Sequence, residues 1–242
     1  MKNQSPTENK NSYYSHSLIL NNKRNAKITG LFFIAATVFA ITGLSLYDPL
    51  LNEENFLIIG DNNTIQMVLG AICELILVAS MTGTAIMLYP YLKRYNNQLG
   101  LGYLCFRLFE ALFISFGIIS MLALLSLSRS YNNSVEADFI MYQTIGNLLK
   151  AIYNYTFIIG PHFMLGINTF IYSYIFYKSN LVPKKLAILG LIGAVLIFIV
   201  ANLKLFNILP QLSSTAIALA IPVAFYEMIL ATWLIRNGFN LR

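Results

Sequence analysis

The chain has 242 residues, of which 57% are hydrophobic and only 11% are charged, whereas ordinary soluble domains carry about 25% charged residues. This composition predicts a multi-pass membrane protein and leaves little chain for a soluble domain. The formal net charge is +6, but no basic patch is interleaved with aromatic residues in a sizeable soluble segment. We therefore expect no nucleic-acid binding.

Six apolar segments reach the roughly 17–25 residues that a helix needs to cross about 30 Å of hydrocarbon. They predict an all-α bundle of six transmembrane helices, over residues 28–46, 65–90, 102–127, 153–177, 186–203 and 215–236. Residues 26–242 then form one transmembrane domain. Residues 1–25 are rich in Asn, Ser, Lys and Tyr without an apolar period, which is typical of a disordered tail.

The distribution of charge predicts the orientation of the helices. With a cytoplasmic N-terminus, twelve of the sixteen basic residues lie on the cytoplasmic side, and the outside loops hold only Arg129, Lys150 and Lys204. This positive-inside pattern places both termini in the cytoplasm. We expect the basic ends to contact membrane lipids, including anionic head groups, at the cytoplasmic face.

Three local patterns predict how the helices connect and pack. The apolar residues of segment 137–152 share a helical face, which favours an interfacial helix on the outer leaflet; the alternative is an outward extension of the fourth span. Gly160-Pro161 predicts a kink in that span. Gly190 and Ala194 have the small-xxx-small spacing of close helix contacts, and Gly238 is a helix stop.

Ionisable residues inside the spans are the candidates for a site. Each charge there costs on the order of 2.5–3.5 kcal/mol by insertion scales, so it normally faces protein and pairs. Their depths predict an inner layer of Arg107, Glu110 and Glu227, and an outer layer of Glu74 and His162. We hypothesise that Arg107 pairs with both inner carboxylates. Helical spacing places small or polar residues beside these groups, including Ala220 and Ala224 near Glu227, and Tyr155, Gly166, Thr169 and Ser173 near His162.

Each layer has two open interpretations. The inner one is either a salt bridge that fixes helix register, for which arginine is well suited, or a site where two acids and one base leave a carboxylate that binds a proton or a cation. The outer one is either a proton relay between Glu74 and His162, or a histidine that satisfies a backbone carbonyl freed by the adjacent proline.

Enzymatic interpretations have little support in the sequence. It contains no H-E-x-x-H, no G-x-S-x-G and no Cys/His set with metal spacing. Cys73 and Cys105 lie in predicted spans, where cysteines behave as small hydrophobes. We predict no catalytic residue, no metal and no cofactor, and lean against an enzyme.

Three segments carry a family resemblance: FRLFEALF (106–113), NLVPKKLAILGLIGA (180–194) and PVAFYEMILATWLIRNGFN (222–240). Together they resemble a bacterial multi-pass membrane family known as domain of unknown function 4386. Its motifs match an Arg-x-x-Glu pair at Arg107 and Glu110, a Pro-basic turn at Pro183 and Lys184, and a last span with Pro222, Glu227, Trp233, Leu234, Gly238 and Phe239. The resemblance implies an integral protein of the bacterial cytoplasmic membrane and no particular activity.

Two functions from different classes follow. The first is small-solute or proton-coupled binding and transport through the buried Arg/Glu cluster. The second is a non-catalytic scaffold or accessory subunit in which the charges are structural salt bridges. A cavity lined by the charged residues would favour the first function, and a dry bundle the second. The sequence predicts neither an oligomeric state nor a protein partner.

Overall fold

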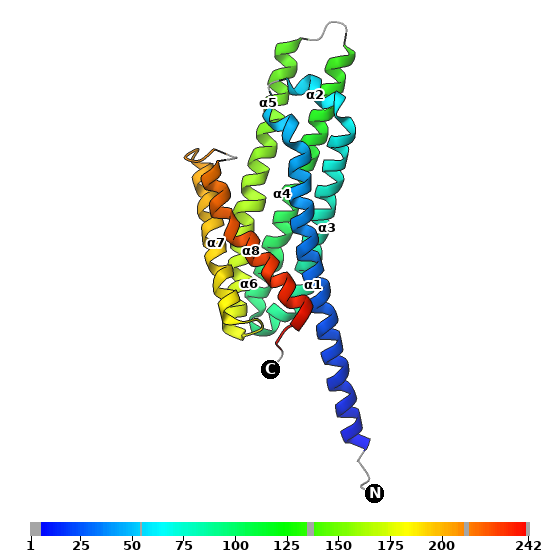
Figure 1. Cartoon of the computed structure of the whole chain (residues 1–242), viewed down its shortest axis with the longest axis vertical. Helices are drawn as coiled ribbons and strands as arrows, with labels where there is room; N and C mark the ends of the chain where they lie inside the picture. The colour runs from blue at the N-terminus through cyan, green and yellow to red at the C-terminus, as the bar shows by residue number, and fades with distance from the viewer. Residues whose placement is uncertain (1–5, 54, 135–137, 211–212, 241–242) are drawn as a thin grey trace.

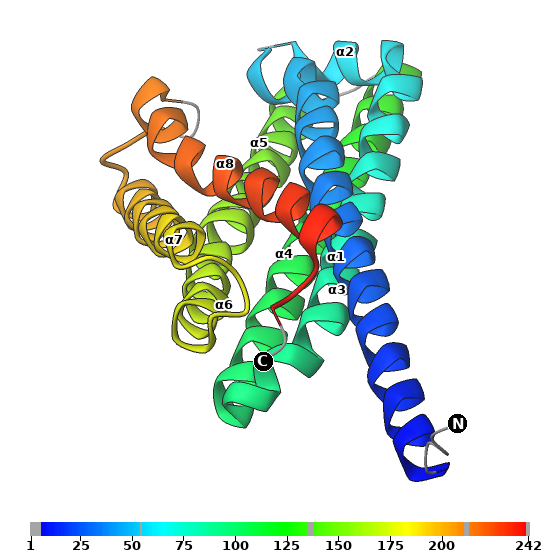
Figure 2. The same cartoon turned by 60° about the horizontal axis from the view of Figure 1, so that its bottom comes forward.

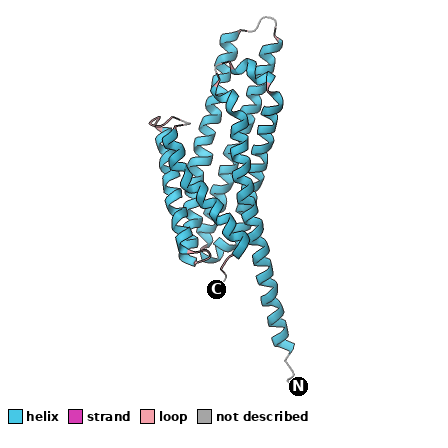
Figure 3. Ribbon diagram, viewed as in Figure 1, coloured by secondary structure: helices cyan, strands magenta, loops and turns pink. Residues whose placement is uncertain are grey.

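The computed structural model describes residues 6–53, 55–134, 138–210 and 213–240, and within these ranges all regular structure is helical (Figure 3). The helical segments are α1 (Pro6–Asn52), α2 (Phe56–Asn62), α3 (Thr64–Tyr95), α4 (Asn97–Asn133), α5 (Phe139–Phe157), the π-helix η1 (Ile158–Met164), α6 (Leu165–Ser179), α7 (Lys184–Leu205) and α8 (Ser214–Asn237). The predicted all-α class is confirmed.

Five helices in the described part of the chain are long and apolar enough to cross a membrane. They are residues 22–52 of α1 and the whole of α3, α4, α7 and α8. This pattern is that of a multi-pass membrane protein. Side-chain caps begin two of the five: Asn96 accepts a hydrogen bond from the Leu99 amide at 3.0 Å, and Ser213 accepts one from the Ala216 amide at 3.1 Å.

The predicted fourth span, 153–177, is not among those five helices because it is divided between α5, η1 and α6. These three segments follow one another without a break, so residues 139–179 are continuously helical. Pro161 lies in the π-helix and has no N–H to donate to the carbonyl of Phe157, four residues before it. The irregularity predicted at Gly160-Pro161 therefore takes the form of a π-helix.

Our preferred prediction of an interfacial helix at 137–152 is wrong over its described residues, 138–152. α5 runs beside α4 (Figure 1) and leads directly into η1, so the alternative, an extension of the fourth helical segment, is correct. The Ser120 hydroxyl of α4 donates to the Leu149 carbonyl at 2.8 Å. Apolar residues at helical spacing suit packing on a neighbouring helix as well as on a lipid surface, so the pattern did not separate the two.

The N-terminal segment also differs from the prediction. α1 is helical from Pro6 onward, and its first turns project from the bundle (Figure 1), whereas we expected a disordered tail through residue 25. A helix extends from an existing end far more readily than it nucleates, so the apolar part of α1 can continue the helix into the polar segment. The Asn22 amide already belongs to the packed part, because it donates to the Phe239 carbonyl at 2.9 Å.

The helices form a bundle whose two sides diverge at one end (Figures 1 and 2). α4 packs against α3, α5 and α6, α1 packs against α3 and α8, and α7 packs against α6 and α8. α8 crosses α1 near the C-terminal end of α8, and the two helices separate toward the other end (Figures 1 and 2). The crossing is close: a Cβ added to Gly30 would lie 2.6 Å from the Ala231 carbonyl oxygen.

The helix contacts predicted from small residues are confirmed for α7. Gly190 contacts Ser173 of α6 and Tyr226 of α8, and the Ala194 carbonyl oxygen would lie 3.2 Å from a Cβ added to Gly166 of α6. Gly193, which we did not single out from the sequence, lies against the backbone of Pro222 and Val223. The predicted helix stop is confirmed too, because Gly238 follows α8 with φ of 76°, a conformation that favours glycine.

Substitution of Gly193 by alanine is expected to destabilise the bundle. The new Cβ would lie 2.9 Å from the Val223 Cα, and backbone cannot move aside as a side chain can. We expect the free energy of unfolding to fall by about 1–3 kcal/mol, as for other overpacked sites, in thermal unfolding of the purified protein. The control is Gly102→Ala in α4, whose Cβ meets only Ile171 Cδ1 at 3.8 Å. Equal stabilities of the two variants would contradict this account of the α7–α8 contact.

Candidate functional site

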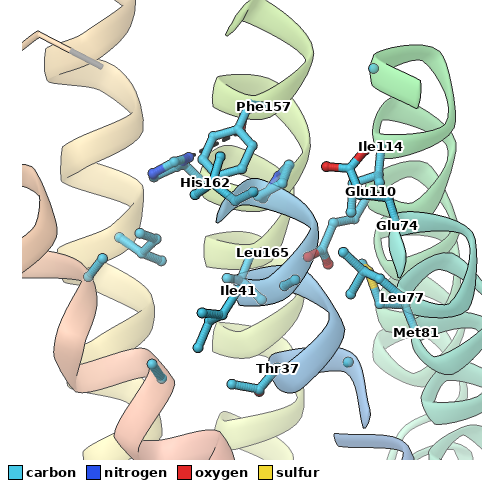
Figure 4. Close-up of a pocket in the computed structure, with 18 of the residues that line it drawn as sticks. Thr37, Ile41, Glu74, Leu77, Met81, Glu110, Ile114, Phe157, His162 and Leu165 are labelled. Atoms are coloured by element: carbon cyan, nitrogen blue, oxygen red, sulfur yellow. Dashed lines mark hydrogen bonds between the residues drawn. The ribbon is translucent and has the colours of Figure 1, made fainter. Parts of the chain in front are cut away.

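A cavity of about 310 Å³ lies among the helices and is lined by all five candidate residues. Figure 4 shows three of them, Glu74, Glu110 and His162, around this space. Its walls come from α1, α3, α4, α5, η1, α6, α7 and α8. The predicted inner and outer layers therefore face one shared space. The candidate residues on its walls are Glu74, Arg107, Glu110, His162 and Glu227.

Arg107 is held by a network that spans three helices. Its side chain is 2% exposed; Nη1 donates to Glu110 Oε2 at 3.0 Å, and Nε donates to Thr84 Oγ1 of α3 at 3.2 Å. The Asn168 amide of α6 donates to the same Glu110 oxygen at 2.6 Å. Arg107 contacts both inner carboxylates, as we hypothesised, but the second contact is longer. Nη2 lies 3.9 Å from Glu227 Oε1, an ion-pair contact beyond hydrogen-bonding distance.

Sequence reasoning missed two members of this network, Thr84 and Asn168. Both are fully buried within apolar helices, where an unpaired polar side chain is costly. Asn168 stands next to Thr169, which we did place on the inward face. An amide side chain within an apolar helix was therefore the signal in the sequence that Asn168 is buried. Nothing in the sequence indicated that its partner is Glu110 on α4.

Glu74 is bound at one oxygen only. Tyr153 of α5 donates from its hydroxyl to Glu74 Oε1 at 3.1 Å. Among the described residues, Glu74 Oε2 and Glu227 Oε1 have no hydrogen-bond partner although both atoms are buried. Figure 4 shows the Glu74 and Glu110 side chains directed into the cavity. The site thus contains carboxylate oxygens whose hydrogen-bonding capacity is unused.

No hydrogen bond joins Glu74 to His162 in the structure, so the proton relay between them stays a prediction. His162 lies across the cavity from Glu74 and Glu110 (Figure 4). Its Nδ1 is 3.1 Å from the Phe157 carbonyl oxygen, which can only accept, so Nδ1 carries the proton. Its Nε2 then accepts from Lys204 Nζ at 3.2 Å. The structure agrees with the alternative interpretation in that the histidine ring contacts the Phe157 carbonyl, to which Pro161 cannot donate.

Lys204 was assigned to an outside loop, and that assignment is wrong. It lies in the last turn of α7 and is 5% exposed. The hydrophobic run predicted from the sequence ends at Leu203, whereas α7 continues for two more residues, to Leu205. A buried lysine needs a partner, and the His162 ring provides one.

The composition of the cavity wall limits what it can bind. Three carboxyl groups, Glu74, Glu110 and Glu227, face it against one guanidinium. In the part of the chain that the structure describes, no group of three or more His, Cys, Asp or Glu side chains is arranged to hold a metal ion. The remaining wall is mostly apolar, which suits a small organic molecule with a few oriented polar contacts.

The comparisons with known proteins identify the chain at the level of its family. The family described as Domain of unknown function (DUF4386) matches residues 28–238, nearly the whole chain. The protein therefore belongs to this family, as the motifs of the third and last spans predicted. No curated protein and no solved structure matches the chain.

Removal of the guanidinium is expected to be the most destabilising single change in the site. Arg107→Met leaves Glu110 and Glu227 buried without a cation, and broken buried pairs cost about 3–5 kcal/mol. The double variant Arg107→Met/Glu110→Gln removes one of these two charges as well, so we expect it to regain part of this loss in thermal unfolding. A double variant that is as unstable as the sum of its single changes would show that the pair is not coupled.

Proposed function

We propose that this protein spans a bacterial cytoplasmic membrane six times, with both termini in the cytoplasm, and carries a small solute through its cavity by exchange with protons. The continuous helical segment 139–179 supports a sixth crossing between α4 and α7. The positive-inside distribution of basic residues supports the orientation, and the family resemblance supports the bacterial membrane.

This proposal rests on two separate carboxylate oxygens, Glu74 Oε2 and Glu227 Oε1. Both are buried, both residues line the cavity, and neither oxygen has a hydrogen-bond partner among the described residues. A structural lock needs one acid for Arg107, and Glu110 already fills that role at 3.0 Å. Additional buried carboxyl groups are expensive unless they bind something. A proton or a cationic solute would each neutralise such a group, and exchange between the two would couple their movements.

The scaffold function remains the second candidate, and one observation favours it. Arg107 has hydrogen-bond partners on α3 and α4, and Asn168 of α6 binds the same carboxylate. Such a network fixes the relative positions of three helices whether or not a solute binds. The two functions differ in the effect they predict on proton flux when Glu227 is neutralised. Glu227 Oε1 has no hydrogen-bond partner among the described residues.

The topology is tested by labelling with a membrane-impermeant maleimide. In a Cys73→Ser/Cys105→Ser background, we introduce Ser134→Cys after α4 or Lys185→Cys at the start of α7; both positions are exposed. Six spans place these residues on opposite sides, so in intact cells only Ser134→Cys should react from outside. Labelling of both positions from the same side would show that segment 139–179 does not cross the membrane.

The transport function is tested in liposomes with a trapped pH dye. We expect proton flux by the wild type and at least a tenfold loss in Glu227→Gln, with little change in thermal stability because Glu227 makes no hydrogen bond to Arg107. Asp48→Asn, an acid-to-amide change at an exposed position of α1, is the matched control. Absence of flux in the wild type, with Glu227→Gln unstable, would favour the scaffold function.

A further inference from the structure

We infer that the solute is a small lipophilic amine, which reaches the cavity from the bilayer as the neutral base through an opening between α1 and α8. It takes a proton from a protonated carboxyl group of the wall and binds there as an ammonium ion. This inference rests on the proposed function and specifies its substrate class and its route. It follows from the charge of the cavity, the chemistry of its walls and the position of its exposed residues.

The sign of the charge comes from the groups that remain available. Glu74 is 5% exposed and Glu227 is 9% exposed, and in the described chain each has a carboxylate oxygen without a hydrogen-bond partner. A buried carboxylate is stabilised by a cation that donates hydrogen bonds, and such charge-assisted bonds are about twice as strong as neutral ones. An ammonium group supplies both the charge and the donors.

Arg107 does not provide an equivalent binding site for an anion. Its Nε and Nη1 already donate to Thr84 and Glu110. Nη2 lies 3.9 Å from Glu227 Oε1, so an anion that reached Nη2 would also meet that carboxylate. A carboxylate or phosphate at this position would meet three carboxyl groups of the wall and would displace existing partners. Lys204 does not line the cavity. Its ammonium group is hydrogen-bonded to Nε2 of His162. The cavity therefore selects against anions.

The apolar walls favour an organic cation over a metal ion. Leu77, Met81, Ile114 and Val223 face the cavity, and they cannot replace the oxygen ligands that a hard cation requires. The Phe157 ring also lines it, and aromatic rings attract organic ammonium groups. A cavity of about 310 Å³ is at the small end of ligand pockets, which suits a molecule with a single ring.

The opening is defined by cavity residues that are also exposed. On α1, Ile41 lines the cavity and is 64% exposed; on α8, Ala224 lines the cavity and is exposed too. These helices are in close contact at Gly30 and Ala231 and diverge from there (Figure 2). Ala224 lies seven residues from Ala231, about 10 Å along α8, so the opening faces the hydrocarbon within an apolar span. A solute that uses it must partition into lipid.

The ligand class is tested with three probes of one shape that differ in charge: 2-phenylethylamine, 2-phenylethanol and phenylacetate. Binding to the full-length protein in lipid nanodiscs is measured by calorimetry at neutral pH. We expect the amine to bind at least tenfold more tightly than either analogue. Glu74→Gln and Glu227→Gln should each weaken amine binding by roughly ten- to a hundredfold, while Asp48→Asn leaves it unchanged. Equal binding of the three probes, or a charge preference that survives both glutamine variants, would overturn the ligand class.

The route is tested with Ala224→Phe, which places a ring in the opening. We expect amine association to slow at least tenfold in stopped-flow measurements. Ala218→Phe makes the same change at an exposed position of α8 that does not line the cavity, and it should bind at the wild-type rate. Equal association rates for the two variants would overturn the lateral route.

The outcomes separate this inference from the proposed transport function. Charge-selective amine binding without amine-driven proton flux in liposomes would support the ligand class and contradict transport. Proton flux through Glu227 without charge-selective binding would support transport and contradict the ligand class.

Discussion

The burial of Arg107 is the constraint on which the rest of the structure depends. A guanidinium in an apolar bundle keeps its charge and must have its donors satisfied by protein groups. Thr84 brings α3 to it, Glu110 comes from the same helix, and Asn168 brings α6 to the shared carboxylate. Glu227 adds α8 through a longer contact. Helices that are far apart in the sequence are thereby held around one polar centre, and the cavity lies beside it.

A second local device, the π-helix at Pro161, joins the two sides of the bundle. The proline cannot donate to the Phe157 carbonyl, and His162 Nδ1 contacts that carbonyl while its other nitrogen binds Lys204 of α7. Gly160 lets this segment approach α4 closely, because a Cβ there would lie 3.0 Å from Phe113 and 3.3 Å from the Glu110 carbonyl oxygen. The histidine therefore acts as a connector between helices.

These two features together explain how a structural network can coexist with the proposed binding site. One carboxylate is enough to hold the arginine, and the hydrogen bonds to Glu110 fulfil that need. The surplus acids, Glu74 and Glu227, remain on the wall of an otherwise apolar cavity. In the proposed function these additional carboxyl groups bind protons and amines, and the adjacent hydrogen-bond network of Arg107 keeps them in place.

The sequence by itself determined the helical class and the five ionisable residues of the candidate site, because composition and helical period report which residues avoid lipid. Its motifs also indicated the family. It did not determine their partners: Glu74 binds Tyr153, and His162 binds Lys204, since pairing depends on the rotation and shift of whole helices. The π-helix also changes the register within one segment, so Tyr155, placed by spacing on the face of His162, is 50% exposed while His162 is buried. Only the tertiary structure decided that both predicted layers share one cavity, because its wall combines residues from helices that are far apart in the sequence.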